Sequence, residues 1–258
     1  MTLRSRCWSL MVAGSTLEKA SFVELKHILS RLADTSANKE KTPGVIVGGW
    51  AVYAFNPYYG SIDIDIVVSG KMRKSLSHWL CTNRDFEELQ TSEVGWQGVR
   101  KLGPGGKWII ADFGSRNEEY RFEGRTEQFN FSEVDGHTVT KTIDGQEVLV
   151  PERALLLLFK LKAAWDRGTR LKAGTSPDPD WEAGKRIKDF ADVLALLDPQ
   201  RGGNDISVSY LGEWFAKYPF LVGILDEAGR TQAAIDRYGH LRTTEARARV
   251  TQVIELTT

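Results

Sequence analysis

The sequence has few cysteines, no long apolar run and no excess of charge of one sign. Two cysteines in 258 residues, Cys7 and Cys81, cannot form a disulfide framework or a thiolate metal cluster, which suits a reducing, cytoplasmic location. No apolar run approaches the ~18 residues of a membrane span, so we expect no membrane contact. Lys plus Arg and Asp plus Glu each number 34, so no overall basic field indicates a nucleic acid, and an RNA partner would need a local patch.

The N-terminal residues have only a weak likeness to a signal peptide. Their apolar stretch, Trp8 to Ala13, is interrupted by Ser9 and is shorter than the usual core of ~7 to 15 residues, so we do not expect export. Alternatively, Met11 is the biological start and the residues before it are disordered. The apolar residues from Leu17 to Leu32 recur at helical spacing and predict a helix.

A short apolar strand that runs into two glycines is the first distinctive feature. Val45 to Val47 end at Gly48 and Gly49, and Trp50 to Phe55 then form a short predicted helix. Glycine lets the backbone approach a ligand closely, and a helix that starts after it directs free N–H groups and its positive dipole end toward an anion. Ser61 adds a hydroxyl that could bind a terminal phosphate. The segment therefore predicts a phosphate-binding turn.

Two aspartates interrupt the next apolar strand. Asp63 and Asp65 lie two residues apart, so both side chains point to one side of the strand, whereas Ile62, Ile64 and Ile66 point to the other. Two carboxylates held this close raise each other's pKa unless a cation lies between them. Mg²⁺ is the natural cation, because it takes carboxylate oxygens and leaves positions for substrate phosphates. The alternative interpretation is an exposed edge strand beside an ordinary turn.

Together these residues resemble a known signature. The glycines at 48–49 and SIDID at 61–65 resemble the nucleotidyltransferase fold of DNA polymerase β, antibiotic nucleotidyltransferases and bacterial AbiEii-type toxins. The resemblance implies an α/β (α+β) fold, in which a small mixed β-sheet with flanking helices precedes a C-terminal helical domain. It also implies transfer of a nucleoside monophosphate from an NTP, with one or two Mg²⁺ ions. Tyr59 occupies the position where the family often has an arginine, so this motif does not identify the cationic side chain that binds the triphosphate.

A third aspartate lies in the predicted strand 107–113. A lone aspartate in a strand is often a strand end or a turn residue. The resemblance implies instead that Asp112 completes the metal site from a neighbouring strand, as a metal ligand or as the base for the attacking hydroxyl. Further on, two Asp-Gly pairs within 129–150 predict a three-stranded meander, since Asp-Gly beside β-branched residues is a hairpin signal.

The predicted helix 152–166 is apolar nearly all round, so it should be buried between layers. A buried lysine needs a partner or a function. Lys162 has Asp166 four residues on, which predicts a surface ion pair. Lys160 is therefore the candidate for binding the triphosphate, and the alternative is that its ammonium reaches the surface.

The segments FKLKAAWDR and KRIKDFADVLALL form a second resemblance, to the AbiEii-type toxins. These toxins carry a lysine on a hydrophobic helix, followed by an R-x-K-D-x-x-D helix. The resemblance implies that Lys160 contacts phosphate, that Arg186 and Lys188 contact phosphate or RNA, and that Asp189 is a catalytic acid. Either Asp112 or Asp189 would then accept the proton of the attacking hydroxyl, and the sequence does not decide between them.

These observations predict an N-terminal helix in 1–40, a nucleotidyltransferase core in 41–150 and a helical substrate domain in 151–258, with the resemblance covering 43–198. The C-terminal segment is locally basic, and its arginines are expected on solvated helix faces, with an RNA-binding groove as the alternative. They are Arg230, Arg237, Arg242, Arg247 and Arg249.

The expected function is Mg-dependent nucleotidyl transfer to an acceptor hydroxyl. The toxin-like motifs favour RNA, above all a tRNA 3′ end, which would make the chain the toxin of a toxin-antitoxin system with an antitoxin partner. A protein hydroxyl or an aminoglycoside-type antibiotic is the alternative acceptor. An inactive nucleotide-binding regulatory module is the alternative of a different class.

Overall fold

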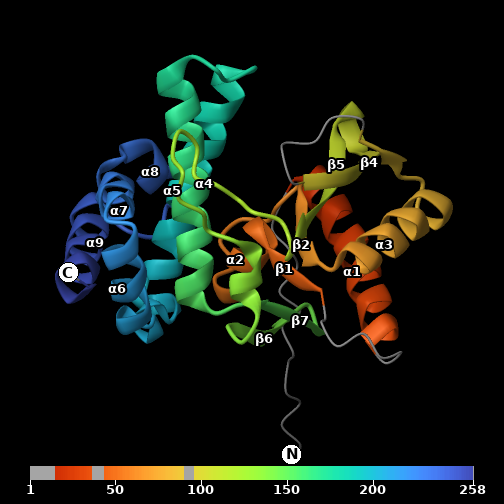
Figure 1. The fold of residues 1–258 in the computed structure, drawn as a ribbon, viewed down its shortest axis with the longest axis horizontal. Coiled ribbons are helices and arrows are strands. Elements are labelled where there is room, and N and C mark those ends of the chain that lie inside the picture. Colours follow the sequence, from red (N-terminus) through yellow and green to blue (C-terminus); the bar gives the residue numbers. More distant parts are fainter. Residues whose placement is uncertain (1–14, 37–43, 90–95, 258) are drawn as a thin grey trace, which may run out of the picture.

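The computed structural model describes residues 15–36, 44–89 and 96–257. Figure 1 shows a mixed α/β architecture, with the main sheet on one side, the helices of the C-terminal half on the other and helix α2 between them. The predicted α/β fold, a small mixed sheet with flanking helices and a C-terminal group of helices, is confirmed. The expectation about Met11 and the residues before it lies outside the described residues.

Five strands form the main sheet, in the order β1, β2, β5, β4, β3. They are β1 (Val45–Val47), β2 (Ile64–Val68), β5 (Trp108–Ser115), β4 (Trp96–Leu102) and β3 (Glu87–Glu88). β2 and β5 run parallel and the other neighbours antiparallel, so the sheet is mixed. The β2–β5 register places Asp65 beside Asp112.

Three helices accompany this sheet: α1 (Thr16–Ser36), α2 (Gly48–Phe55) and α3 (Gly70–Asn83). The predicted apolar stripe of α1 is buried, as helical spacing requires. Trp50 of α2 is fully buried, and its indole N–H donates a hydrogen bond of 3.2 Å to Ser21 of α1. α2 is thereby held rigidly at the glycine pair from which it begins.

Two long helices follow the sheet and pack against each other, α4 (Arg153–Ala173) and α5 (Pro179–Leu197). α4 is longer than the predicted helix 152–166 and continues to Ala173, and α5 begins at Pro179. Gly174, with φ of 67°, ends α4 in the left-handed conformation that glycine favours. Asp178 then caps α5, because its side chain accepts a hydrogen bond of 3.0 Å from the Trp181 N–H.

The predicted three-stranded meander over 129–150 is wrong in its first strand. β6 (Thr138–Ile143) and β7 (Gln146–Pro151) form a separate two-stranded hairpin, and the first predicted strand is a 3₁₀ turn. The ring of Phe129 packs 4.6 Å from that of Trp214, in the C-terminal helices. This aromatic packing holds the segment against the helices, so it cannot pair with β6.

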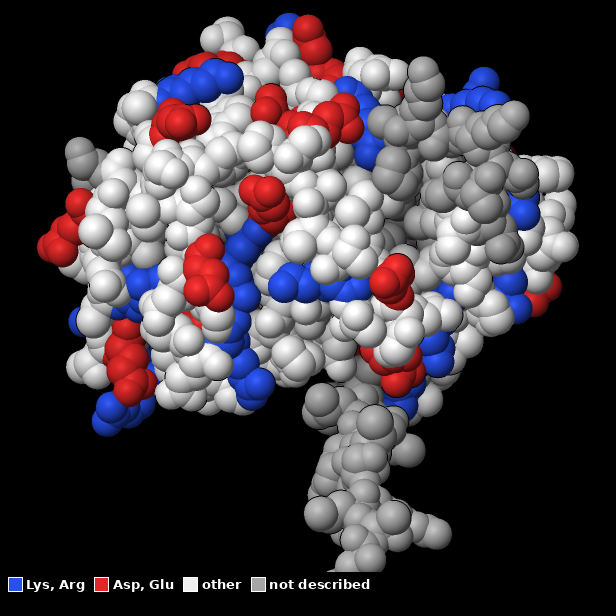
Figure 2. Space-filling model, turned by 90° about the horizontal axis from the view of Figure 1, so that it is seen from below, with Lys and Arg blue, Asp and Glu red and all other residues white. Residues whose placement is uncertain are grey.

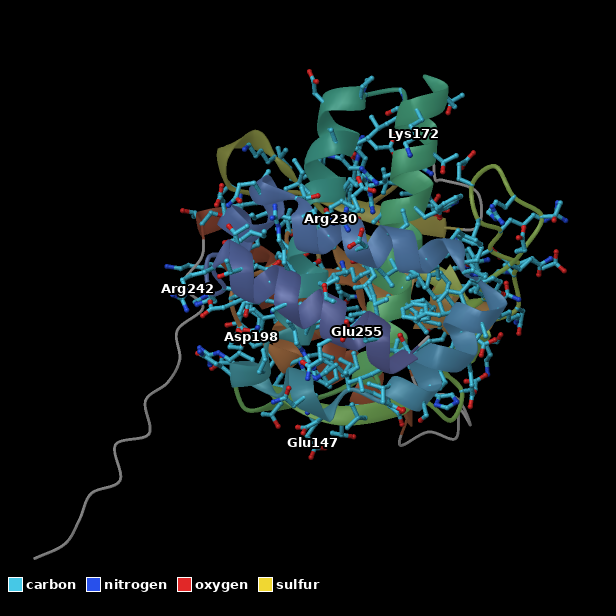
Figure 3. The ribbon with its side chains drawn as sticks, turned by 90° about the vertical axis from the view of Figure 1, so that its left-hand side faces the viewer. Glu147, Lys172, Asp198, Arg230, Arg242 and Glu255 are labelled. Carbon is cyan, nitrogen blue, oxygen red and sulfur yellow. The ribbon has the colours of Figure 1, made fainter. Side chains whose placement is uncertain are left out.

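Four further α-helices follow in the described part of the chain. They are α6 (Val208–Lys217), α7 (Phe220–Arg230), α8 (Gln232–Tyr238) and α9 (Thr243–Thr257). Arg230 and Arg242 project from their outer surface (Figure 3). Arg230 pairs with Asp226 of α7, and Arg242, which lies just before α9, pairs with Glu245 of that helix. Arg249 is buried instead, and its guanidinium donates to the carbonyl oxygens of Leu197 and Gly203.

Charges of both signs are interspersed on the face shown in Figure 2. This agrees with the zero net charge of the sequence. None of the helices in the described ranges is long and apolar enough to cross a membrane.

Candidate active site

A cavity of about 770 Å³ lies between the sheet and the α4–α5 pair. Its sheet side carries the three predicted aspartates, and its helix side carries most of the cations. The sheet contributes Gly48, Asp63, Asp65, Trp108, Ile110 and Asp112, and the helices contribute Lys160, Arg167, Arg170, Trp181, Lys185 and Asp189. The cavity thus brings together residues from both halves of the chain.

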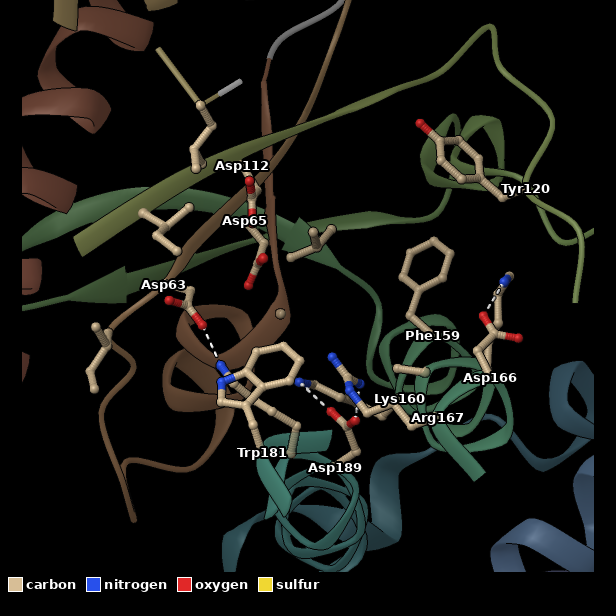
Figure 4. A pocket seen from close by; sticks show the side chains of 18 of the residues that line it. Asp63, Asp65, Asp112, Tyr120, Phe159, Lys160, Asp166, Arg167, Trp181 and Asp189 are labelled. Carbon is tan, nitrogen blue, oxygen red and sulfur yellow. Dashed lines mark hydrogen bonds and ion pairs between the residues drawn. The ribbon is translucent and has the colours of Figure 1, made fainter. Parts of the chain in front are cut away.

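Asp65 and Asp112 lie side by side on adjacent parallel strands (Figure 4). Two glycines make room for their carboxylates. A Cβ on Gly48 would lie 1.8 Å from Asp65 Oδ2, and a Cβ on Gly98 of β4 would lie 2.3 Å from Asp112 Oδ1. Gly48 also has φ of +65°, which other residues rarely adopt. Gly48 therefore serves the carboxylate as well as the turn.

Asp63 lies just before β2 and is ion-paired with Lys185 of α5 (Figure 4). Burial raises the pKa of Asp65, and the neighbouring Asp63 raises it further, although Lys160, Lys185 and Lys188 oppose the shift. A carboxylate in this position favours a cation next to it, because a positive charge restores its ionised form.

The carboxylates fit a divalent cation of the Mg²⁺ class. No group of three His, Cys, Asp or Glu side chains in the described ranges has the arrangement of a complete metal site. Mg²⁺ does not require one, since it commonly binds one or two carboxylates and completes its shell with water and substrate phosphates. Asp65 and Asp112 supply such a pair, and Asp63 is nearby but paired with Lys185.

Lys160 lines the cavity from α4 and is only 7% exposed. Its ammonium lies 2.7 Å from Asp192 Oδ2 and 3.4 Å from Asp189 Oδ1. Burial alone would lower the pKa of Lys160, but Asp192 and Asp189 raise it above its usual range. Two carboxylates thus supply the partners that a buried lysine needs, and the side chain stays charged at the cavity.

Asp189 lines the cavity between two cations. Its carboxylate pairs with Lys160 and with Arg167 of α4 (Figure 4). Asp112 lies on the opposite wall, in register with Asp65. The two candidates for the third catalytic acid therefore stand in different surroundings, one among cations and one beside a carboxylate.

The structure also brings Gly49, Ser61 and Lys188 together, but behind the cavity wall. A Cβ on Gly49 would lie 2.7 Å from Ser61 Oγ and 2.9 Å from Lys188 Nζ. Ser61 is buried, and Lys188 pairs with Asp192 at 3.0 Å. Among the predicted phosphate-binding residues, Gly48 and Lys160 line the cavity directly, whereas these three do not line it.

Arg186 faces away from the cavity. Its guanidinium packs 4.8 Å from the Phe190 ring, lies 2.7 Å from the Glu227 carboxylate and donates to the Ala164 carbonyl oxygen. These contacts tie α5 to α4 and α7. In this structure Arg186 is therefore a packing residue of the helices. The predicted surface pair of Lys162 and Asp166 is formed at 2.5 Å, although both side chains are largely buried.

Several cavity residues were not predicted from the sequence, above all Arg167, Arg170 and Lys185. The helical period contained a signal for them. Positions 160, 163, 167 and 170 share one face of α4, and positions 185, 189 and 192 share one face of α5. Once Lys160 and Asp189 were chosen, this spacing already favoured Arg167 and Lys185 over Arg186.

Comparison with known proteins gives distant structural neighbours. No protein-family model matches the sequence, and no curated protein matches it. A candidate nucleotidyltransferase from Thermotoga maritima aligns over 61% of this chain and 90% of its own, with 16% identity and a TM-score of 0.42. An antigenic nucleotidyltransferase-like protein from Paracoccidioides brasiliensis aligns over 93% of both chains, with 16% identity and a TM-score of 0.40. Similarities this weak carry no argument, so the assignment of function rests on the site.

Proposed function

We propose that this chain is a nucleotidyltransferase, which transfers a nucleoside monophosphate from an NTP to an acceptor hydroxyl. The observation that carries the proposal is the pair Asp65 and Asp112, held in register on β2 and β5 and facing the cations of α4 and α5 across one cavity. Carboxylates on one wall suit a metal ion, and cations on the other suit phosphates.

In the proposed reaction, the acceptor oxygen forms a bond to the α-phosphorus of the NTP while the bond to the pyrophosphate oxygen breaks. A Mg²⁺ ion held by Asp65 and Asp112, with Asp63, would supply Lewis-acid stabilisation of the phosphate charge. Lys160 and Lys185 neutralise the negative charge that develops on the pyrophosphate. The N-terminal end of α2 at Gly48 adds backbone N–H groups next to it.

Asp112 is the better candidate for the group that takes the proton of the acceptor hydroxyl. Asp189 is ion-paired with Lys160 and with Arg167, so its oxygens are already occupied by two cations. Asp112 is in register with Asp65 on the neighbouring strand. Its strand position also places it at the carboxylate wall, where the reacting hydroxyl would lie.

For the acceptor we propose RNA, above all a tRNA 3′ end, and a toxin role with an antitoxin partner in the cytoplasm. The support is the helix pair that carries Lys160 and Asp189 in the toxin-like spacing, together with the cations Arg167 and Arg170 in the cavity. Protein hydroxyls and aminoglycoside-type antibiotics remain the competing acceptors, and an inactive nucleotide-binding module is the competing class.

The test is incubation of the purified chain with each α-³²P-labelled NTP, Mg²⁺ and total tRNA, followed by gel separation of RNA from protein. We expect label on the RNA, and we expect Asp63→Asn/Asp65→Asn to lower the rate by at least about 10²-fold, as loss of a main electrostatic stabiliser does. Label on the protein would redirect the acceptor to a protein hydroxyl. Equal labelling by wild type and the double variant would overturn the assignment of the site.

A further inference from the structure

Two tryptophans at the cavity are more exposed than their size would suggest. Six large apolar side chains in the described ranges are exposed, and two of them, Trp108 at 38% and Trp181 at 51%, line the cavity. Large aromatic side chains are usually well buried in a monomer. Exposed indoles at a cavity with charged neighbours are typical of sites where a flat ligand stacks.

Trp181 stands on the helix wall, close to the proposed metal and phosphate groups. It lies in the first turn of α5, where the cap Asp178 binds its backbone N–H. The Lys185 ammonium lies 5.2 Å from the centre of its ring, and the same ammonium pairs with Asp63 (Figure 4). A nucleotide whose phosphates reach Lys185 would therefore have its base within reach of this indole.

Trp108 stands on the sheet wall, farther from the carboxylates. Trp108, Ile110 and Asp112 lie on one face of β5 and all line the cavity. Trp108 and Asp112 lie four positions apart on the strand, roughly 13 Å at the usual rise. A ligand that offers a hydroxyl at Asp112 and a ring at Trp108 must therefore be extended.

Cations accompany Trp108 as they accompany Trp181. The Arg100 guanidinium lies 4.1 Å from the centre of the Trp108 ring, and Lys107, the residue before it, also lines the cavity. Ring stacking beside positive charge suits a single-stranded nucleic acid, which offers bases and phosphates in alternation.

We propose that Trp181 stacks on the base of the incoming nucleotide and that Trp108 stacks on an unpaired base near the 3′ end of a single-stranded RNA acceptor. This inference rests on the proposed function, because it assigns the two substrates of that reaction to the two walls of the cavity. It makes Trp181 a residue for nucleotide binding and Trp108 a residue for acceptor binding, so their substitution has different effects.

The experiment measures binding without turnover. Fluorescence anisotropy follows a short 5′-fluorescein-labelled single-stranded RNA, and calorimetry follows non-hydrolysable α,β-imido NTPs with Mg²⁺. We expect Trp108→Ala to weaken RNA binding about 10-fold, within the range that loss of one base stack produces, and to leave nucleotide binding unchanged. Trp181→Ala should weaken nucleotide binding by a similar factor and leave RNA binding unchanged.

Phenylalanine at either position should restore most of the affinity, because it keeps a stacking face. Leu102→Ala is the matched control, since Leu102 pairs with Trp108 across the β4–β5 hairpin, is 58% exposed and does not line the cavity. It should leave both ligands unaffected. The proposal would be overturned if both alanine variants bound RNA and nucleotide as tightly as wild type does.

The proposal would also be overturned if each variant lost affinity for RNA and for nucleotide to the same extent while its circular dichroism spectrum stayed unchanged. The result is independent of the transfer assay. If the wild type labels no acceptor but the two variants lose their respective ligands, the proposed reaction fails and the assignment of the two indoles stands.

Discussion

Gly48 illustrates how a missing side chain determines the position of a carboxylate. Its φ is positive, and the place that a Cβ would occupy is taken by Asp65 Oδ2. Two requirements therefore meet at one position, the turn into α2 and the close approach of an acid from β2. Either alone favours glycine, and together they leave no room for another residue.

Gly48→Ala is expected to damage the site more than the fold. The backbone strain should lower the free energy of unfolding by about 1–3 kcal/mol, and displacement of Asp65 should lower the transfer rate by at least about 10²-fold. Gly145→Ala is the control, because Gly145 has φ of +80° with open space around it. Urea unfolding should show similar losses of stability in the two variants. The transfer assay should show a lower rate only in Gly48→Ala. A normal rate in Gly48→Ala would contradict the role given to Asp65.

At the scale of elements, α5 connects the helical half of the chain to the sheet. Lys185 pairs with Asp63, and Asp192 binds Lys160, Lys188 and the Tyr58 hydroxyl. One face of α5 thereby reaches the segment before β2, helix α4 and the loop after α2. The position of α5 decides which cations line the cavity.

The first turn of α5 depends on its cap. Asp178→Ala should lower the free energy of unfolding by about 1 kcal/mol, because the Trp181 N–H loses its acceptor. Fraying of that turn should also weaken nucleotide binding several-fold, as calorimetry would show. Ser207→Ala removes the cap of α6, which accepts from the Tyr210 N–H, and should cost similar stability without changing nucleotide binding. The same loss of nucleotide affinity in both variants would argue against a specific role of this turn.

Element boundaries also mark where prediction from sequence ended. The helix α1, the glycine turn and β2 follow local periodicity, and the structure has them where the sequence placed them within a few residues. The extra strand predicted within 129–150 is absent, because Phe129 packs on Trp214, far along the chain. An Asp-Gly hairpin signal predicts a turn, but it does not predict whether the segments on both sides of the turn pair as strands.

At the scale of the whole molecule, buried ion pairs join segments that are distant in sequence. Burial raises the pKa of Asp192, but Lys160, Lys188 and the Tyr58 hydroxyl lower it more, to about 2. Burial likewise raises the pKa of Glu24 on α1, but Arg84 and Lys101 bring it below its usual range. Both carboxylates stabilise the folded state only while ionised.

These two shifts determine how stability should change with pH. A carboxyl whose pKa is lowered by folding contributes stability above its unfolded pKa and loses it as the pH falls toward the folded value. The free energy of unfolding should therefore fall as the pH drops from about 4.5 toward about 2. Urea unfolding at a series of pH values measures this slope.

Glu24→Gln should remove part of that acid dependence. The variant should be less stable than wild type at pH 7 by roughly 1–3 kcal/mol, because Arg84 and Lys101 lose a charged partner, and the difference should shrink at low pH. Glu87→Gln is the control, since the Glu87 side chain is 56% exposed and pairs only at the surface with Arg100. A difference between Glu24→Gln and wild type that stays constant with pH would contradict this assignment.

The sequence by itself determined what depends on neighbours along the chain. Alternation along β2 places Asp65 on the side opposite Ile64 and Ile66, although Asp63 lies before the strand and Ile62 lines the cavity with it. The glycine pair marks a tight turn before a helix, and the apolar run around Lys160 marks a buried helix whose charge needs a partner. Each of these follows from backbone geometry with a period of a few residues. The position of Asp112 on a neighbouring strand came from the family resemblance, and the register of β2 and β5 agrees with it.

Only the tertiary structure decided which charges meet. Lys185 reaches Asp63 across 122 positions of sequence, whereas the neighbouring Arg186 turns to α7. Which of the two side chains faces the sheet depends on how α5 is rotated about its axis, because successive side chains of a helix point about 100° apart. The same rotation places Trp181 at the cavity, which Trp108 of β5 also lines. Rotation and packing of this kind are set by contacts between distant segments, because the burial of both helices' apolar faces fixes them together.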